Sequence, residues 1–184
     1  MMSYNILVQD SVQAMNIDAL NRSAVCAANV DNGNIFYLAT KSATAGEGEV
    51  WTATEPATNS GLLFSCKLLG TTYISIADGS IGTQRVTAYQ LEVVDNSTGV
   101  WMAYSPEIVT VTSGSSKYRG LNNDPRNFTN LEDEVFTAFK PQVGDIITMT
   151  ADGIGTTAIG SNTYAVAKDG QYKLDWASAA NAAG

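Results

Sequence analysis

The stretch VFTAFKPQVGDIITMTA, residues 135–151, predicts two β-strands joined by a sharp corner. Its second half alternates between two faces, as successive side chains of a strand do. Pro141 interrupts strand pairing and Gly144 tolerates a positive φ, so the chain can turn between the two apolar runs. Asp145 is expected to tie down backbone N–H groups of its own turn. We therefore predict that Pro141, Gly144 and Asp145 form a structural corner.

Most of the chain follows the same pattern of short alternating runs separated by turn residues. Asn32-Gly33 between two apolar runs predicts one hairpin, and Asp169-Gly170 predicts another. Residues 61–70, GLLFSCKLLG, fit either a buried strand or a short buried helix, which periodicity alone does not separate. About ten short strands with turns at such spacing are typical of an all-β domain. The predicted fold class is mainly β: an antiparallel β-sandwich or barrel with short hairpins, an N-terminal arm or short helix, and long loops.

Sequence pattern divides the chain into three parts. Residues 1–22 are expected to form an N-terminal arm or a short helix, because residues 10–22 offer a capping residue and a weak apolar stripe. Residues 23–176 form the expected β-domain. Residues 177–184 are rich in small side chains and are expected to be a flexible tail.

Composition narrows the classes of partner. The chain has 184 residues, of which 45% are hydrophobic and 15% charged, which suits one folded core. A net charge of −8 and scattered basic residues disfavour nucleic-acid binding. The N-terminal residues lack the pattern of a secretory signal, and no apolar run has the length of a membrane-spanning helix. We therefore expect no nucleic-acid partner and no membrane partner.

The residue types needed for the commonest catalytic sites are missing. The sequence contains no His, which removes Ser-His-Asp and Cys-His arrangements and the commonest general base. Cys26 and Cys66 are far apart and have no CxxC partner, so they are expected to be buried free thiols, with a Cys26–Cys66 disulfide as the alternative. The acidic run at residues 132–134 is typical of a solvated surface. We predict a protein that is not an enzyme, with no catalytic residue, no cofactor and no metal site.

The long polar connection over residues 113–130 is the main candidate for contact with a partner. It has no clear periodicity, and such long connections in compact domains are usually functional. Tyr and Arg side chains anchor interfaces because they supply large contact areas and forked hydrogen bonds. The alternative is that these residues fold back on their own domain. The residues predicted for the interface are Tyr118, Arg119, Asn123, Arg126 and Phe128.

Five blocks of sequence, in a fixed order, carry a resemblance to a known family. They are VWTATEP (50–56), VWMAYSPE (100–107), KYRGLNNDPRNFTN (117–130), AFKPQVGDIITMTADGI (138–154) and YAVAKDGQYKL (164–174). This succession resembles the capsid decoration, or head cement, proteins of tailed bacteriophages. The segment 57–96 is longer than the linker expected in that family, so it is a candidate inserted hairpin pair or subdomain.

The resemblance implies a structural virion protein, made in the host cytoplasm and located on the outer surface of the capsid. Its implied partner is the major capsid protein, whose subunit contacts it would stabilise, and copies of the chain are also candidates for association with one another on the capsid. The residues leave one alternative open, a carbohydrate- or receptor-binding β-domain of a phage tail or surface protein. Aromatic side chains with polar Ser, Thr and Asn neighbours are typical of sugar sites.

Overall fold

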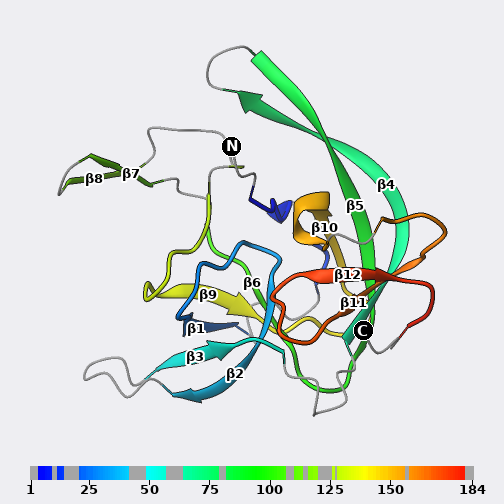
Figure 1. Ribbon diagram of the computed structural model, residues 1–184, viewed down its shortest axis with the longest axis horizontal. Helices are drawn as coiled ribbons and strands as arrows, with labels where there is room; N and C mark the ends of the chain where they lie inside the picture. The colour runs from blue at the N-terminus through cyan, green and yellow to red at the C-terminus, as the bar shows by residue number, and fades with distance from the viewer. Residues whose placement is uncertain are drawn as a thin grey trace.

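The computed structural model describes residues 4–9, 12–14, 21–41, 49–56, 64–78, 82–106, 110–113, 116–119, 126, 128–155 and 158–180. These residues form a closed five-stranded barrel, an open five-stranded sheet and a two-stranded hairpin (Figure 1). The predicted mainly β fold class is therefore confirmed.

The barrel and the sheet are built from different parts of the chain. In order around the barrel, the strands are β1 (Asn21–Val25), β3 (Val50–Thr54), β2 (Ile35–Lys41), β6 (Trp101–Ala103) and β9 (Phe136–Phe139). Across the sheet they are β10 (Ile146–Thr150), β5 (Gly82–Asn96), β4 (Phe64–Asp78), β11 (Tyr164–Ala167) and β12 (Leu174–Ala177). The separate hairpin pairs β7 (Thr110–Ser113) with β8 (Ser116–Arg119), and a 3-10 turn, η4 (Ala151–Gly153), follows β10. β1 and β3 pair in parallel, and the other strand ladders are antiparallel.

The predicted corner joins the barrel to the sheet. β9 closes the barrel and β10 forms an edge of the sheet, so the corner sets how the two units meet. Gly144 has φ 95°, the left-handed conformation that favours glycine. The buried Asp145 carboxylate accepts a hydrogen bond from the Gln142 N–H at 2.8 Å, as predicted. The Pro141 carbonyl accepts a hydrogen bond from Asn96 Nδ2 at 2.7 Å, which fastens the corner to the end of β5.

Alternation along the barrel strands produces two hydrophobic cores. Phe36 and Ala138 point inward and pack in the barrel core, whereas their neighbours Ile35 and Phe139 point outward and are buried against the sheet. The outward residues share the larger core with sheet residues such as Leu91. Because one wall of the barrel is packed against the sheet, the two units form a continuous body.

The segment 57–96 contributes one long hairpin, β4–β5. The ambiguous run at 61–70 is a strand from Phe64 onward and contains a register shift between Leu68 and Gly70. The base of the hairpin forms the middle of the five-stranded sheet, so within the described residues it is not a separate subdomain. Figure 1 shows the upper part curving away from the rest of the sheet as a two-stranded ribbon.

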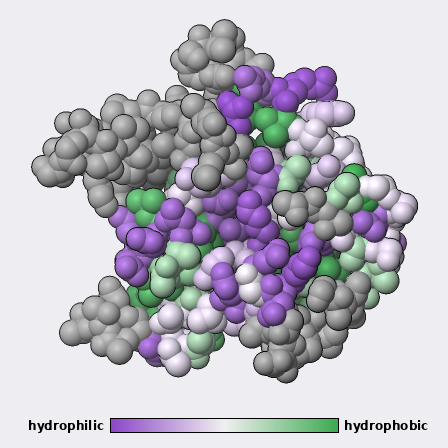
Figure 2. Space-filling model, viewed as in Figure 1, coloured by the Kyte–Doolittle hydropathy of each residue, from purple (hydrophilic) through white to green (hydrophobic). Residues whose placement is uncertain are grey.

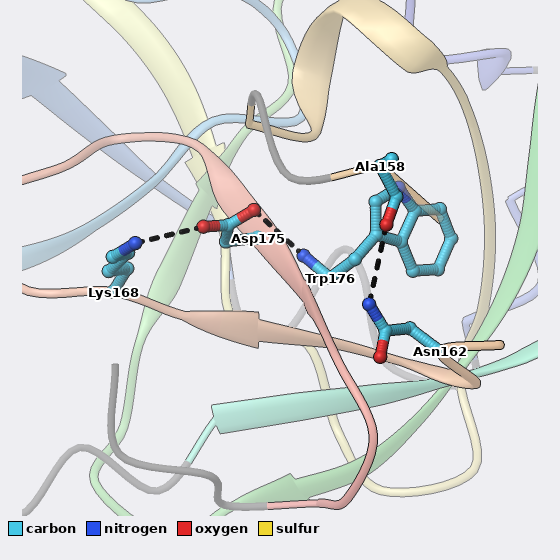
Figure 3. Close-up of polar contacts among 5 residues, drawn as sticks. All are labelled: Ala158, Asn162, Lys168, Asp175 and Trp176. Atoms are coloured by element: carbon cyan, nitrogen blue, oxygen red, sulfur yellow. Dashed lines mark hydrogen bonds and ion pairs between the residues drawn. The ribbon is translucent and has the colours of Figure 1, made fainter. Parts of the chain in front are cut away.

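The two predicted turns behave differently. Asp169-Gly170 lies in the β11–β12 hairpin, although the strands are joined by a longer loop than the predicted two-residue turn. The buried Asp175 carboxylate links the two sides of this hairpin by binding Lys168 Nζ at 3.0 Å, and it also accepts the N–H of its neighbour Trp176 at 3.0 Å (Figure 3). The Asn32-Gly33 turn is present, with Gly33 at φ 85°, but the predicted hairpin is wrong. Its two flanks do not pair, since β1 pairs with β3 and β9, and β2 with β3 and β6.

The N-terminal residues that the structure describes pack along β10. Leu7 is buried and forms a bridge with Met149, and Gln13 forms a bridge with Ile146. The helix expected over residues 10–22 is not present at residues 12–14 or 21–22, and the rest of that range lies outside the described residues. The predicted tail is described as far as residue 180, and β12 extends into it by one residue, Ala177.

Candidate functional site

The predicted interface residues are only partly described. Tyr118 and Arg119 lie in β8, at the periphery of the molecule (Figure 1), but their side chains are outside the description, as is the whole of Asn123. Arg126 Nη1 donates a hydrogen bond to Gln84 Oε1 at 2.7 Å, which ties this segment to the ribbon. Phe128 is buried and therefore folds back on its own domain. The predicted polar connection over residues 113–130 also contains a strand, β8, which pairs with β7 just before it.

The ribbon carries an exposed surface that sequence analysis did not single out. β11 pairs with β4 only over residues 65–67, and β10 pairs with β5 only over residues 88–92. Beyond these ladders, Tyr73 is 59% exposed and the Arg85 guanidinium lies over its ring at 4.6 Å. Leu69, at the register shift, is 45% exposed. We call Leu69, Tyr73, Ser75 and Arg85 the ribbon surface.

Among the described residues, the outer edge of β4 has no neighbouring strand along most of its length. Past Leu68, the described residues place no strand beside it. The edge sequence GTTYISIA, residues 70–77, has no charged residue and no Pro. Natural edge strands usually carry such residues because an open edge can pair with another chain. The β4 edge is therefore suited to strand addition.

A buried polar network fastens the N-terminal segment between the barrel and the sheet. The Asn5 N–H donates to Asp31 Oδ2 at 3.1 Å, and Asn5 Nδ2 donates to the Asn32 carbonyl at 2.5 Å. The Thr150 hydroxyl donates to Asn5 Oδ1 at 3.0 Å and accepts the Ile6 N–H at 3.0 Å. These hydrogen bonds satisfy the buried amide of Asn5, so the network has a structural role. At the surface, hydrophilic residues gather in the middle of the face shown in Figure 2.

Asp31 is the titratable group of this network. Burial raises the pKa of its carboxyl above the ordinary value of 3.8, because removal from water disfavours the charged form. The hydrogen bonds from Asn5 and Thr129, and the positive charge of Lys173, oppose this shift without cancelling it. The folded state therefore holds the proton of Asp31 more tightly than the unfolded state.

The cysteines are buried free thiols, as predicted. Burial raises the pKa of the Cys66 thiol, which keeps it protonated and unreactive. Cys26 Sγ lies 3.0 Å from the Tyr172 hydroxyl. The pKa of Tyr172 is raised by burial first and by this hydrogen bond second. Both cysteines have packing roles.

A hollow of about 520 Å³ opens at one end of the barrel. β1 and β3 begin there and β2 ends there, as the pairings Ser23↔Val50 and Lys41↔Trp51 show. Two cations lie over indole rings at this end: Lys41 Nζ is 5.9 Å from the Trp51 centroid, and Arg22 Cζ is 5.9 Å from the Trp101 centroid. We call it the barrel-end hollow; it is lined by Asn21, Arg22, Ser23, Lys41, Glu49, Trp51 and Thr137.

Within the described residues, no group of three or more Cys, Asp or Glu side chains is placed to hold a metal ion. No helix in the described part of the chain has the length and apolar character needed to span a bilayer. The chain matches no protein-family model, no curated protein and no solved structure.

Proposed function

We propose that this protein is a non-enzymatic structural protein of a tailed-bacteriophage virion. It binds the outer surface of the head and stabilises contacts between major capsid protein subunits. Support comes from the ordered blocks that resemble head decoration proteins and from the absence of His in the sequence. The barrel, the sheet and the N-terminal segment are packed into one body, which suits a protein that reinforces a shell.

The observation that carries the proposal is the ribbon surface. A two-stranded hairpin is marginally stable on its own in water, yet here it extends beyond the sheet with Tyr73 and Leu69 exposed. An aromatic residue with an Arg on its ring is the kind of residue pair that anchors protein interfaces. The uncharged β4 edge beside it adds backbone donors and acceptors for a neighbouring strand. We place the capsid contact on this ribbon, next to the segment of Arg126 that is hydrogen-bonded to it.

Binding to an assembled shell explains how such a protein would stabilise it. A ligand that binds the assembled state and has no equivalent site on free subunits shifts the equilibrium toward assembly by mass action. Many copies on a symmetric shell each contribute this stabilisation. No catalytic group is needed for this role.

Purified ribbon variants test the proposal on heads that lack the protein. The double variant Tyr73→Ala, Leu69→Ser should bind heads about tenfold more weakly or worse, since side chains that become buried at the centre of an interface commonly contribute that much. The melting temperature should stay near that of the wild type, because both side chains are exposed. Val143→Ser is the matched control, because Val143 is 67% exposed and lies at the corner away from the ribbon. Equal head binding by the double variant and the wild type would overturn the assignment to the ribbon.

A further inference from the structure

We propose that the barrel-end hollow binds a saccharide that carries a carboxylate, such as a uronic acid. Its volume of about 520 Å³ falls within the range of small-molecule sites, roughly 300–1,000 Å³. Its lining comes from four neighbouring strands, β9, β1, β3 and β2, whose ladder hydrogen bonds fix the positions of the side chains. The site is separate from the ribbon surface and does not depend on the proposed attachment to the head.

The half-buried Trp51 supplies an aromatic surface for a sugar ring. It lines the hollow and pairs with Ala24 of β1 on one side and Lys41 of β2 on the other. Large aromatic side chains with a few placed polar groups are typical of ligand sites, and the C–H face of a pyranose is apolar enough to pack on an indole. Lys41 Nζ is 5.9 Å from the ring centroid, near the outer limit of a cation–π contact. Its ammonium group is therefore weakly held and is available to an anionic ligand.

The charges around the hollow favour an acidic sugar. The lining holds two basic side chains, Arg22 and Lys41, and one carboxylate, that of Glu49, so the hollow is locally positive although the chain as a whole has a net charge of −8. The Lys41–Glu49 contact is 3.8 Å long and the Glu49 side chain is 96% exposed, so this pair contributes little. Arg22 Nη1 donates to the Asn21 carbonyl at 2.8 Å. The other N–H groups of its guanidinium match the geometry of a carboxylate.

Neutral polar groups complete the lining. Ser23 and Thr137 are paired across the β1–β9 ladder, so their hydroxyls lie on adjacent strands, and Asn21 adds an amide. Hydroxyl and amide groups can both donate and accept hydrogen bonds, which suits sugar hydroxyls. A nucleic acid fits less well, since its dense charge would extend beyond the two cations of the hollow onto a chain whose net charge is negative.

Calorimetric titration with tri-galacturonate, and with its fully methyl-esterified form, tests the ligand class. The ester keeps the sugar rings and removes the charges, so the acid should bind at least about tenfold more tightly. Added salt should weaken acid binding, because exposed charges are screened. No binding of the acid, or equal binding of acid and ester, would overturn the proposal.

Two arginine variants test the position of the site. Arg22→Gln should reduce affinity for tri-galacturonate by about tenfold, because it removes a charged donor. Arg85→Gln is the matched control, since Arg85 also lies over an aromatic ring, at 4.6 Å, but on the ribbon. The control should bind as the wild type does, and circular dichroism should show both variants folded. Unchanged binding by Arg22→Gln, or an equal loss in Arg85→Gln, would overturn the site.

Discussion

The Asn5 side chain occupies the space where Gly153 would carry a Cβ. A Cβ built there would overlap Cγ, Nδ2 and Oδ1 of the Asn5 amide. Gly33 approaches the same amide from another side, since a Cβ there would lie 2.6 Å from Asn5 Nδ2. The N-terminal segment is therefore lodged between two glycines, one after β10 and one before β2, in addition to its hydrogen bonds.

Gly153→Ala should destabilise the protein by displacing Asn5. Overpacking of a tight site costs about 1–3 kcal/mol, and a displaced Asn5 would also lose its bonds to Asp31, Asn32 and Thr150. Chemical denaturation followed by circular dichroism measures the change in the free energy of unfolding. Gly70→Ala is the control, because a Cβ at Gly70 meets no atom within 4 Å. If both variants had the same free energy of unfolding, the close fit of Asn5 against Gly153 would not contribute to stability.

Asp31→Asn should change how stability depends on pH. The raised pKa of Asp31 means that its proton stabilises the folded state. This contribution is fully present below the carboxyl's ordinary pKa of 3.8 and is lost as the pH rises through the raised folded value. The free energy of unfolding of the wild type, minus that of the variant, should therefore fall as the pH rises through this window. Denaturation at a series of pH values measures the difference, and an increase with pH would contradict the assignment.

The thiols should react only on unfolding. Both cysteines are buried and free, and burial raises the pKa of the Cys66 thiol. A thiol reagent such as dithionitrobenzoate should therefore release almost no colour from the native protein. In denaturant the reagent should react with both Cys26 and Cys66, the 2 cysteines of the chain. Rapid reaction of the native protein would show that the packing around one cysteine opens readily.

The segment around Arg126 should contribute to head binding together with the ribbon. Replacing Tyr118, Arg119 and Arg126 with Ala should weaken attachment to heads without a large change in melting temperature. Arg126 is joined to the ribbon through Gln84, so part of its effect should be to position that surface. Co-sedimentation with heads and thermal melting separate these outcomes. A large drop in melting temperature would assign the three residues to the stability of the domain instead.

Local patterns predicted the elements well and their partners poorly. The strand–corner–strand at 135–151 is confirmed, because alternation, Pro141 and Gly144 all act within a few residues. The Asn32-Gly33 turn is also present, but hairpin pairing failed. The Asn32 amide is instead bonded to the backbone of Ser105, far along the chain, at 2.8 and 2.9 Å. Such long-range anchoring leaves no signal in a local window of sequence.

The candidate sites also depend on contacts between residues far apart in the sequence, which local patterns do not predict. The polar connection at 113–130 was visible in the sequence because it lacks periodicity, yet Phe128 proved to be buried. The barrel-end hollow was not visible, since Arg22, Lys41 and Trp51 come together only when the barrel closes. The ribbon surface depends on where β10 and β11 stop pairing with the longer strands, which is again set by tertiary structure. The run of uncharged residues at 70–77 was the one signal that could have indicated it.

The most direct test of the proposed function is a binding assay on expanded phage heads that lack this protein. The purified wild-type chain should co-sediment with the heads in a saturable manner, leave free capsid subunits unbound, and raise the temperature at which the heads break open. Failure to bind at saturating concentration, with no gain in the thermal stability of the heads, would contradict the account.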